Sequence, residues 1–376
     1  MASQRNCSCI VQTCVPKYRV PVFAEVSKLE KGGFRVFAGS EYFTEALKTE
    51  CNSEKWYREV SNVFLLGRRF LLQRLFRSEL FTAKVVIFEL NPRILSTWVA
   101  VFMARVSGVR ILFWGHVEGR GERGAVLVAI RRYLLSLARG MVCYTARDAT
   151  TLRREGYREP VWVPMNSCVS RHQARLGRSE RTNALYVGRL IEDKKVDLLI
   201  RSIVPLLKKG SLTRLEIAGG GPELERLKSL AVSCEVTDQV IFHGPVFDSS
   251  LLAQMHDRAV FTASPGYIGL SAIQSLAYGV PVVIAREEPH APEIEVCEED
   301  ENCVFFKSDD QVDFSRAVES LLQRPEHWDA RRSGMVEKVK ANYSYEAMAE
   351  EFSRVFSGKP SIHAEVELLR VGDVVL

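Results

Sequence analysis

Short apolar runs alternate with segments of helical periodicity along the chain, and this alternation constrains the fold more than any other feature. Such runs, separated by helices of roughly 10 to 15 residues, are typical of parallel sheets covered on both faces. In the first half we expect strands at 84–88, 109–114 and 141–144, an extended stretch at 160–164, helices at 94–107, 126–137 and 146–155, and further short apolar runs at 18–24 and 34–37. In the second half we expect strands at 184–187, 214–218, 240–242, 259–262 and 280–284, and helices at 196–207, 222–231, 249–255, 271–278 and 345–356.

A polar, basic stretch at 170–182 separates the two series of alternating elements. A chain of 376 residues is too long for one ordinary core and long enough for two domains of nearly equal size. We therefore expect an α/β protein with an N-terminal Rossmann-like domain at 1–178, a C-terminal one at 182–358 and a tail at 359–376. Two such domains joined by a linker predict a cleft between them, which is a common place for ligands.

The cysteines and the apolar stretches argue against secreted and integral membrane proteins. Nine cysteines, an odd number that is widely scattered, do not form a disulfide framework, so we expect reduced thiols in the cytoplasm. The first six residues are polar and do not resemble a signal peptide. The longest apolar stretch, 94–115, contains Arg105 and Arg110, so we interpret it as a buried helix followed by a strand.

Charge is distributed unevenly between the two halves of the chain. Residues 1–181 carry 30 Lys and Arg against 15 Asp and Glu, whereas residues 182–376 carry 21 against 31. The densest basic segment, 68–77, has its arginines, leucines and phenylalanines at helical spacing. Such a helix could lie on an anionic membrane, or it could pack its apolar stripe on its own core. The basic excess of the whole half favours an anionic membrane surface as partner, and no recognition motif indicates nucleic acid.

Three motifs in the second half point to phosphate chemistry. Gly188-Arg189-Leu190 follows a strand, and Lys194 comes shortly after, so two cations could stabilise a diphosphate leaving group without a metal ion. Gly219-Gly220-Gly221-Pro222 also follows a strand and opens a predicted helix. Its glycines indicate close approach either of an anion to helix-start amides or of another protein segment.

The third motif, at 264–283, combines a loop, a helix, a glycine stop, a proline and a strand. Gly269 and Leu270 would present amides at the start of the helix, where phosphate binds well. Gln274 lies one turn further along and could reach ribose hydroxyls. Core packing alone would also explain the apolar residues of this helix.

In this order, the three motifs resemble those of the retaining glycosyltransferases of family 4, which have the GT-B fold. The resemblance is clear over 183–356 and general in the first half. It implies that Arg189 and Lys194 bind the donor diphosphate, that Gly220 and Gly221 belong to the family's glycine turn, and that the nucleotide base lies near the segment containing His243 and Gly244. The family's E-x7-E element maps onto Gly266 and Gln274, so both glutamates are absent.

These departures leave roles open to neighbouring groups. Gln274 can accept ribose hydroxyls through its carbonyl oxygen, and Tyr267 can offer a hydroxyl where Gly266 has no side chain. The P-G-x-x-G-L and S-L-A-Y-G pattern is similar to that of bacterial surface-polysaccharide transferases. In the first half, His116 ends a strand where the family often has a histidine near the donor sugar, although it could simply cap a loop.

Weaker candidates in the first half are Glu118, Arg120, Asn91 and Arg93. No D-x-D triplet, metal-ligand spacing or nucleophile elbow occurs, so we expect no catalytic metal and no cofactor.

The resemblance implies a retaining, metal-independent transfer of a sugar from a nucleotide-diphosphate donor to a glycan or lipid-linked glycan, in bacterial surface polysaccharide or lipopolysaccharide synthesis. The expected place is the cytoplasm, with peripheral binding to the inner face of the plasma membrane as an option. A sugar-nucleotide epimerase and a non-catalytic nucleotide-binding subunit of the same fold are the alternatives.

Overall fold

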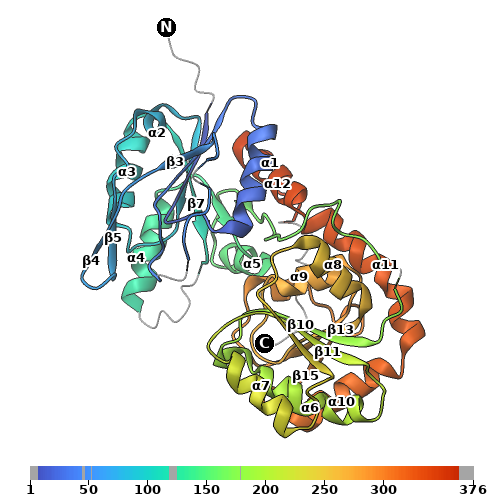
Figure 1. Cartoon of the computed structure of the whole chain (residues 1–376). Coiled ribbons are helices and arrows are strands. Elements are labelled where there is room, and N and C mark those ends of the chain that lie inside the picture. The colour runs from blue at the N-terminus through green and yellow to red at the C-terminus, as the bar shows by residue number, and fades with distance from the viewer. Residues whose placement is uncertain (1–6, 45–46, 52, 118–124, 178, 364–376) are drawn as a thin grey trace. The chain divides into compact units, whose positions relative to one another are not determined.

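The computed structural model describes residues 7–44, 47–51, 53–117, 125–177 and 179–363. The chain divides into two compact units. Of the described residues, those up to 167 and those from 345 to 363 form the N-terminal unit, and those from 168 to 344 form the C-terminal unit (Figure 1). Both are parallel sheets with helices on their faces, as the alternation in the sequence predicts.

The N-terminal sheet has the strand order β3-β2-β1-β6-β7-β8-β9, and all its strands are parallel. Its strands are β1 (Ser8–Gln12), β2 (Phe34–Ala38), β3 (Tyr57–Glu59), β6 (Val85–Glu89), β7 (Arg110–Gly115), β8 (Met141–Cys143) and β9 (Val161–Trp162). Its helices are α1 (Val20–Leu29), α2 (Ser78–Thr82), α3 (Leu95–Val106), α4 (Ala125–Ser136) and α5 (Ala146–Arg154). The apolar run at 18–24 therefore belongs to a 3-10 turn, Lys17–Arg19, and to the start of α1.

The segment 68–77 is not a helix, so that prediction was wrong. Strands β4 (Asn62–Leu65) and β5 (Phe70–Gln73) form an antiparallel hairpin, in which Leu71 and Gln73 are buried and Leu72 is exposed. The turn is made by three consecutive residues with φ of +50°, +63° and +64°, from Leu66 to Arg68. A left-handed backbone at these positions ends any helix and reverses the chain.

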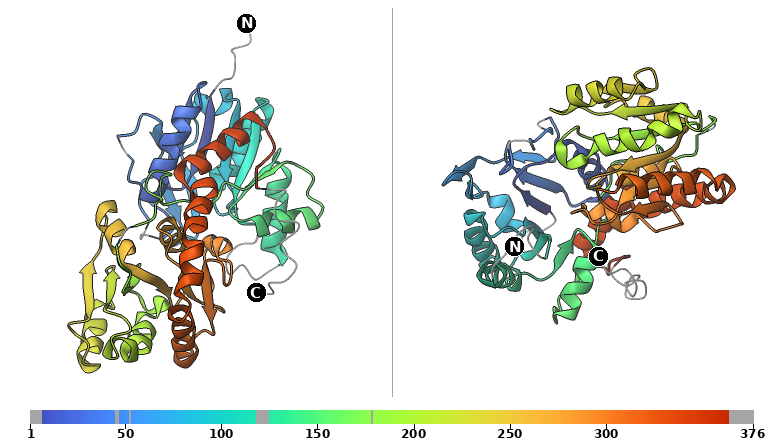
Figure 2. Two further views of the ribbon diagram at one scale, coloured as in Figure 1. Left: turned by 90° about the vertical axis from the view of Figure 1, so that its right-hand side faces the viewer. Right: turned by 90° about the horizontal axis from the view of Figure 1, so that it is seen from below.

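Helix α12 (Tyr345–Ser357) belongs to the N-terminal unit, whereas the predicted domain boundary placed it with the second half. Phe352 and Phe356 are fully buried in the same core cluster as Phe23 of α1, and Figure 2 shows the two helices side by side. The Arg110 side chain donates hydrogen bonds to the carbonyls of Val355 and Phe356. A helix with this much buried aromatic surface is part of the core, not an appendage.

The C-terminal sheet has the order β12-β11-β10-β13-β14-β15, also entirely parallel. Its strands are β10 (Asn183–Val187), β11 (Arg214–Ala218), β12 (Val240–Gly244), β13 (Ala259–Ser264), β14 (Val282–Ala285) and β15 (Cys303–Phe306). Its helices are α6 (Val196–Lys208), α7 (Leu224–Ser233), α8 (Ser249–Arg258), α9 (Ser271–Ala277), α10 (Gln311–Leu322) and α11 (Pro325–Asn342), with 3-10 turns η2 (Glu192–Lys194) and η3 (Pro292–Val296).

The predicted linker at 170–182 is attached to the C-terminal unit rather than free. Arg181 donates to the carbonyls of His256, Ala259 and Tyr278, and Arg175 pairs its amide with Ala277. Burial of the Arg181 guanidinium lowers its pKa to about 10.

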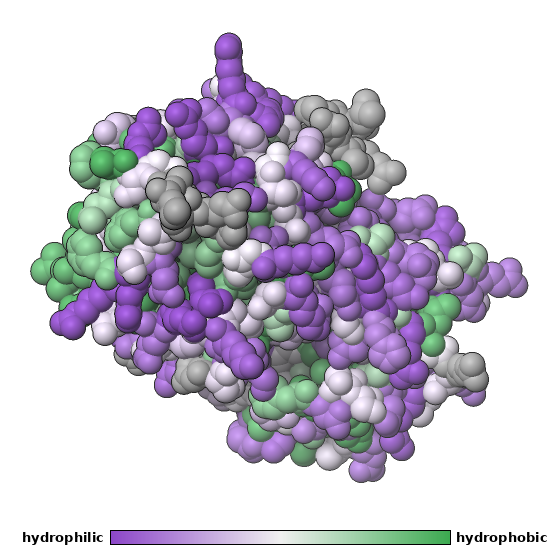
Figure 3. Space-filling view, turned by 90° about the horizontal axis from the view of Figure 1, so that it is seen from above, coloured by the Kyte–Doolittle hydropathy of each residue, from purple (hydrophilic) through white to green (hydrophobic). Residues whose placement is uncertain are grey.

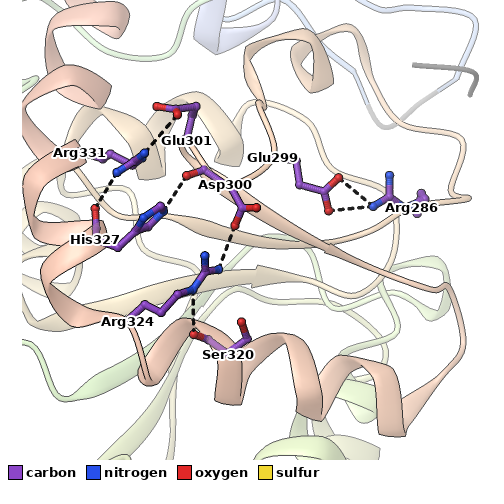
Figure 4. Close-up of polar contacts among 8 residues, drawn as sticks. All are labelled: Arg286, Glu299, Asp300, Glu301, Ser320, Arg324, His327 and Arg331. Atoms are coloured by element: carbon purple, nitrogen blue, oxygen red, sulfur yellow. Dashed lines mark hydrogen bonds and ion pairs between the residues drawn. The ribbon is translucent and has the colours of Figure 1, made fainter. Parts of the chain in front are cut away.

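An acidic loop before β15 is held by polar contacts to α11 and to Arg324, the residue just before that helix (Figure 4). Arg324 pairs with the Asp300 carboxylate at 2.9 Å, His327 contacts the Asp300 carbonyl at 2.8 Å, and Arg331 pairs with Glu301. Arg286 makes two contacts to Glu299. Part of the acidic excess of the second half is therefore paired locally with arginines.

Candidate functional site

The candidate site lies at the carboxyl edge of the C-terminal sheet. Strands β10 and β13 are neighbours there, and the chain winds away from them in opposite directions. In open parallel sheets, ligands bind at such a switch point, beyond the carboxyl ends of the strands. The loops that follow the two strands, 188–195 and 265–270, carry the motifs that the sequence singles out.

The two predicted cations come together on Tyr267. The Arg189 Nη2 donates to the Tyr267 hydroxyl at 3.0 Å. The Lys194 Nζ donates to the Tyr267 carbonyl at 2.6 Å and lies 3.3 Å from the centroid of its ring. Tyr267, which lies 78 positions after Arg189 and 73 after Lys194, thus contacts both cations, as the fold requires if both loops end at the same sheet edge.

The charged form of Lys194 is disfavoured at this position. Burial, followed by the charge of Arg189, lowers its pKa to about 8. An anion bound between the two cations would oppose this lowering, because it adds negative charge to the smaller contributions of Asp193 and Glu293, which raise the pKa of Lys194. A depressed lysine pKa beside a second cation is a feature of functional sites.

Close backbone packing explains the glycine at position 266. A Cβ on Gly266 would lie 2.0 Å from the carbonyl oxygen of Asp193 and 2.9 Å from the Cα of Lys194. No side chain fits there while the 193–194 backbone keeps its position. The close contact between Gly266 and the Asp193–Lys194 backbone therefore explains why a glutamate, which the family has at this position, is absent here.

The same explanation applies to two of the three glycines at 219–221. A Cβ on Gly219 would meet the Gly188 carbonyl at 1.8 Å, and one on Gly221 would meet the Leu190 carbonyl at 2.2 Å. The Leu190 amide donates to the Gly220 carbonyl at 2.9 Å. The glycine turn thus accommodates another protein segment, the loop that carries Arg189, which was one of the two interpretations of the sequence.

Helix α7 begins two residues later than predicted. It spans Leu224–Ser233, so Pro222 lies in the turn before the helix. The Glu223 amide donates to the Leu190 carbonyl, and the Leu224 amide donates to the Gly221 carbonyl. These two amides at the start of the helix are consequently occupied by protein groups.

At the third motif, backbone amides are available at the start of α9. Within the described residues, the amides of Gly269, Leu270 and Ser271 donate no hydrogen bond to the protein. Gln274 is half-buried one turn further along the same helix. Gly269 and Leu270 thus lie directly before α9 and Gln274 lies on it, and their ligand-binding roles stay predictions.

Two residues that the sequence did not indicate surround this loop. The Ile268 amide donates to His290 Nδ1 at 3.1 Å, so His290 Nε2 carries the hydrogen and donates to the Ala285 carbonyl at 2.8 Å. Burial lowers the pKa of His290, which favours this neutral form. The Glu293 side chain is buried beside Gly269. Neither residue belongs to a recognisable motif, so only tertiary structure identifies them.

His243 is engaged by the sheet through its side chain. Its Nε2 lies 3.0 Å from the buried carboxylate of Glu216, which also accepts from Asn183 at 2.7 Å and pairs with Arg258 at 3.4 Å. The imidazole of His243 is therefore part of a structural polar cluster. The residue is nevertheless exposed, and only its Nε2 takes part in this cluster.

In the N-terminal unit, His116 follows β7 as predicted. Its Nδ1 lies 3.3 Å from Asp148 Oδ2, and its ring is 4.7 Å from that of Tyr144. Asp148 fixes the ring orientation in the way that a carboxylate orients a catalytic histidine. No motif in the sequence singles out Asp148, which only the tertiary structure places beside His116.

The other candidate site residues of the first half either bond to protein groups or lie outside the described residues. The Arg93 guanidinium donates to the carbonyls of Arg68 and Arg69, and Asn91 bonds Glu89 at 3.3 Å. Glu118 and Arg120 lie outside the described residues. Among the residues that are described, no group of His, Cys, Asp and Glu could hold a metal ion.

Comparison with known proteins finds a family match within the C-terminal unit. Residues 171–340 match the glycosyl transferases group 1 family. An uncharacterized glycosyltransferase of Haemophilus influenzae is 25% identical over 248 residues, 66% of this chain and 69% of that protein. The GDP-mannose-dependent α-(1-6)-phosphatidylinositol monomannoside mannosyltransferase of Mycobacterium tuberculosis is 30% identical over 197 residues, half of each chain.

Solved structures show the fold of the whole chain. Anabaena HepE in complex with UDP aligns with a TM-score of 0.68 at 12% identity, over 94% of this chain and all of the other. A glycosyltransferase from Rickettsia africae aligns with a TM-score of 0.69 at 11% identity, over 95% and 99%. The chain has the GT-B fold, two Rossmann-like α/β units with parallel sheets.

Proposed function

We propose that the chain transfers a sugar from a nucleoside-diphosphate donor to an acceptor hydroxyl, with retention and without a metal ion. The observation that carries the proposal is the cation pair on Tyr267, at the switch point of a unit that matches glycosyl transferases group 1. The structure of HepE contains UDP, which supports a nucleoside diphosphate as the ligand class.

In the proposed reaction, the bond between the anomeric carbon and the β-phosphate oxygen breaks as the acceptor oxygen bonds the anomeric carbon on the same face. The acceptor proton passes to the departing diphosphate. Arg189 and Lys194 would stabilise the charge that develops on that diphosphate, and the amides of Gly269 and Leu270 would add to them. His116, held by Asp148, remains our candidate for orienting the transferred sugar.

The acceptor that we favour is a lipid or a lipid-linked glycan. The mycobacterial relative acts, by its name, on a phosphatidylinositol mannoside, which is a lipid-borne sugar. Surface polysaccharide or lipopolysaccharide synthesis remains the proposed setting, at the cytoplasmic face of the plasma membrane.

The first test is calorimetric titration with UDP and with GDP. Arg189→Ala and Lys194→Ala should each weaken binding of the preferred diphosphate by roughly tenfold to a hundredfold, because each removes a charge-assisted contact. Lys228→Ala is the matched control, since Lys228 lies on α7 and pairs with Glu225. Equal affinities in all four proteins would contradict the assigned site.

The second test concerns turnover. With the donor identified by titration and lipid extracts as acceptor, product NMR should show the donor's anomeric configuration, and activity should persist in EDTA. An inverted product or EDTA-sensitive transfer would refute the corresponding part of the proposal.

A nucleotide-binding subunit without catalysis is the alternative that the steric exclusion of a side chain at Gly266 favours. Tight diphosphate binding without transfer to any lipid fraction would indicate it. Interconversion of free sugar nucleotides without any acceptor would instead indicate an epimerase.

A further inference from the structure

Helix α3 exposes an apolar stripe that the sequence suggested would be buried. Val99, Phe102 and Val106 lie along one side of the helix at i, i+3 and i+7, and they are exposed, Phe102 by 68%. Ala100, Val101 and Ala104 occupy the opposite side and are buried. The helix is therefore apolar on both sides, which a helix covering a water-exposed surface normally is not.

Helix α4 repeats this pattern. Val126, Leu127, Ile130 and Tyr133 are exposed along one side, whereas Leu134 and Leu135 face the core. The Tyr133 ring stacks on Trp98 of α3 at 6.2 Å between centroids. The two helices therefore adjoin, and this contact places their apolar stripes in neighbouring positions.

The β4–β5 hairpin continues the same surface. Val63 and Leu72 are directly paired across the two strands and are both exposed. Phe76, just after β5, is 71% exposed and lines a small recess together with Phe81 and Ala100 of α3. Figure 3 shows hydrophobic residues gathered at the left of the molecule, where Figure 1 places α3 and the hairpin.

Arginine is the only charged residue in the segments that form this face. The segments 62–77, 95–106 and 125–136 contain seven arginines and no aspartate or glutamate, although Arg68 pairs with Glu41 and Arg132 with Glu155 outside these segments. Arg69 and Arg74 are exposed, and no described acidic side chain pairs with them. Arg105 donates to the Leu137 carbonyl and remains exposed.

We propose that this arginine-flanked face, formed by the hairpin, α3 and α4, binds an anionic lipid bilayer. Exposed aromatic and aliphatic side chains enter the interface between headgroups and acyl chains, and the arginines contact the lipid phosphates. No described helix is long and apolar enough to cross a membrane, so binding through this face would be peripheral. A second copy of the chain is disfavoured as occupant, because a symmetric contact would bring the arginines of two copies together.

The proposal is tested with the full chain and without nucleotide, so its failure is distinguishable from failure of the proposed transfer activity. The measurement is flotation with vesicles of phosphatidylcholine alone, or with a third of the lipid replaced by phosphatidylglycerol. Binding should require phosphatidylglycerol. It should weaken as salt rises from about 0.1 to about 0.5 M, because added salt screens the attraction between the arginines and the lipid phosphates. Absence of binding to phosphatidylglycerol vesicles, or equal binding to both, overturns the proposal.

Two sets of variants locate the face. Phe102→Ser and Phe76→Ser should each weaken binding about tenfold or more, since each removes an aromatic ring from the interface. Phe247→Ser is the matched control, because Phe247 is 78% exposed in the C-terminal unit and should leave binding unchanged. Arg69→Gln with Arg74→Gln should cost roughly fivefold per arginine, against no change for Arg214→Gln with Arg316→Gln in the C-terminal unit.

Circular dichroism and thermal unfolding identify any variant that does not fold. The variants that do fold then test whether this face binds the membrane. If the controls reduce binding as much as the test variants, the face is wrongly assigned. If sedimentation shows a dimer that Phe102→Ser converts to a monomer, the occupant is a second copy and the membrane proposal is refuted.

Discussion

The contact between Gly266 and the Asp193–Lys194 backbone makes a sharp prediction for Gly266→Ala. A Cβ at this position would lie 2.0 Å from the Asp193 carbonyl oxygen, whereas side-chain carbons essentially never come closer than 3.0 Å to such an atom. The difference, 1.0 Å, is the least displacement that the substitution requires. Both partners are backbone of packed loops, so neither can rotate away.

That displacement acts on the Lys194 ammonium. Its bond to the Tyr267 carbonyl is 2.6 Å long, and a shift of about 1 Å would take it beyond hydrogen-bond length. We expect a loss of roughly 1–3 kcal/mol in the free energy of unfolding from overpacking. We also expect UDP or GDP affinity to fall about tenfold or more, because Lys194 no longer faces the ligand in a fixed position. Thermal unfolding and calorimetric titration measure the two effects.

Gly269→Ala provides the matched control for stability. Its Cβ would meet Ala291 at 3.5 Å and Glu293 at 3.7 Å, which are ordinary contacts, so the free energy of unfolding should change by less than about 0.5 kcal/mol. For binding, the control is Gly334→Ala on α11, where nothing lies within 4 Å. If Gly266→Ala unfolds at the wild-type temperature and binds diphosphate with wild-type affinity, the close approach of the loops does not hold Lys194.

Three further predictions concern Lys194, Asp148 and Phe352. Because the folded pKa of Lys194 is about 8 against an ordinary 10.5, the unfolded chain binds more protons between these values, so the free energy of unfolding should rise with pH across this window. Diphosphate affinity should fall over the same range as the ammonium loses its charge, and a pH series of titrations on wild type and Lys194→Ala would show it; a flat wild-type profile contradicts the assignment. Asp148→Asn should lower turnover roughly tenfold by loosening His116 while leaving diphosphate affinity unchanged, and equal losses in both would point to a structural role. Phe352→Ala should cost about 3–5 kcal/mol in urea unfolding, against less than about 0.5 kcal/mol for the exposed Phe247→Ala; a small effect at Phe352 would mean that α12 is not part of the core.

The sequence predicted the part of the C-terminal unit from β10 to β14, because these elements are short, strongly apolar and separated by glycine or proline, but β15, α10 and α11 were not predicted. Strands β10 and β11 lie within one residue of their predicted bounds, and the cations at Arg189 and Lys194 meet. Both cations lie in the loop after β10, and parallel topology accounts for their contact with Tyr267, since the loop after β13 ends at the same edge of the sheet.

Other features were inaccessible to local patterns. The turn from Leu66 to Arg68 depends on backbone angles that leucine and arginine rarely adopt, so the segment was taken for a helix. Strand β1 contains serine, cysteine and glutamine, and its complete burial follows from its central place in the sheet. The exposure of Phe102 could not be predicted either, because an apolar helix is normally a buried one.

Helix α12 has a consequence for how the protein is made. The C-terminal unit is complete once residue 344 has been synthesised, but the core around Phe23 still lacks Phe352 and Phe356 at that moment. A nascent chain on the ribosome therefore carries an unfinished first unit while the second folds, and its uncovered aromatic surface is available to chaperones until translation passes residue 357. Fragments that stop at the linker should for the same reason be poor candidates for separate expression of the first unit.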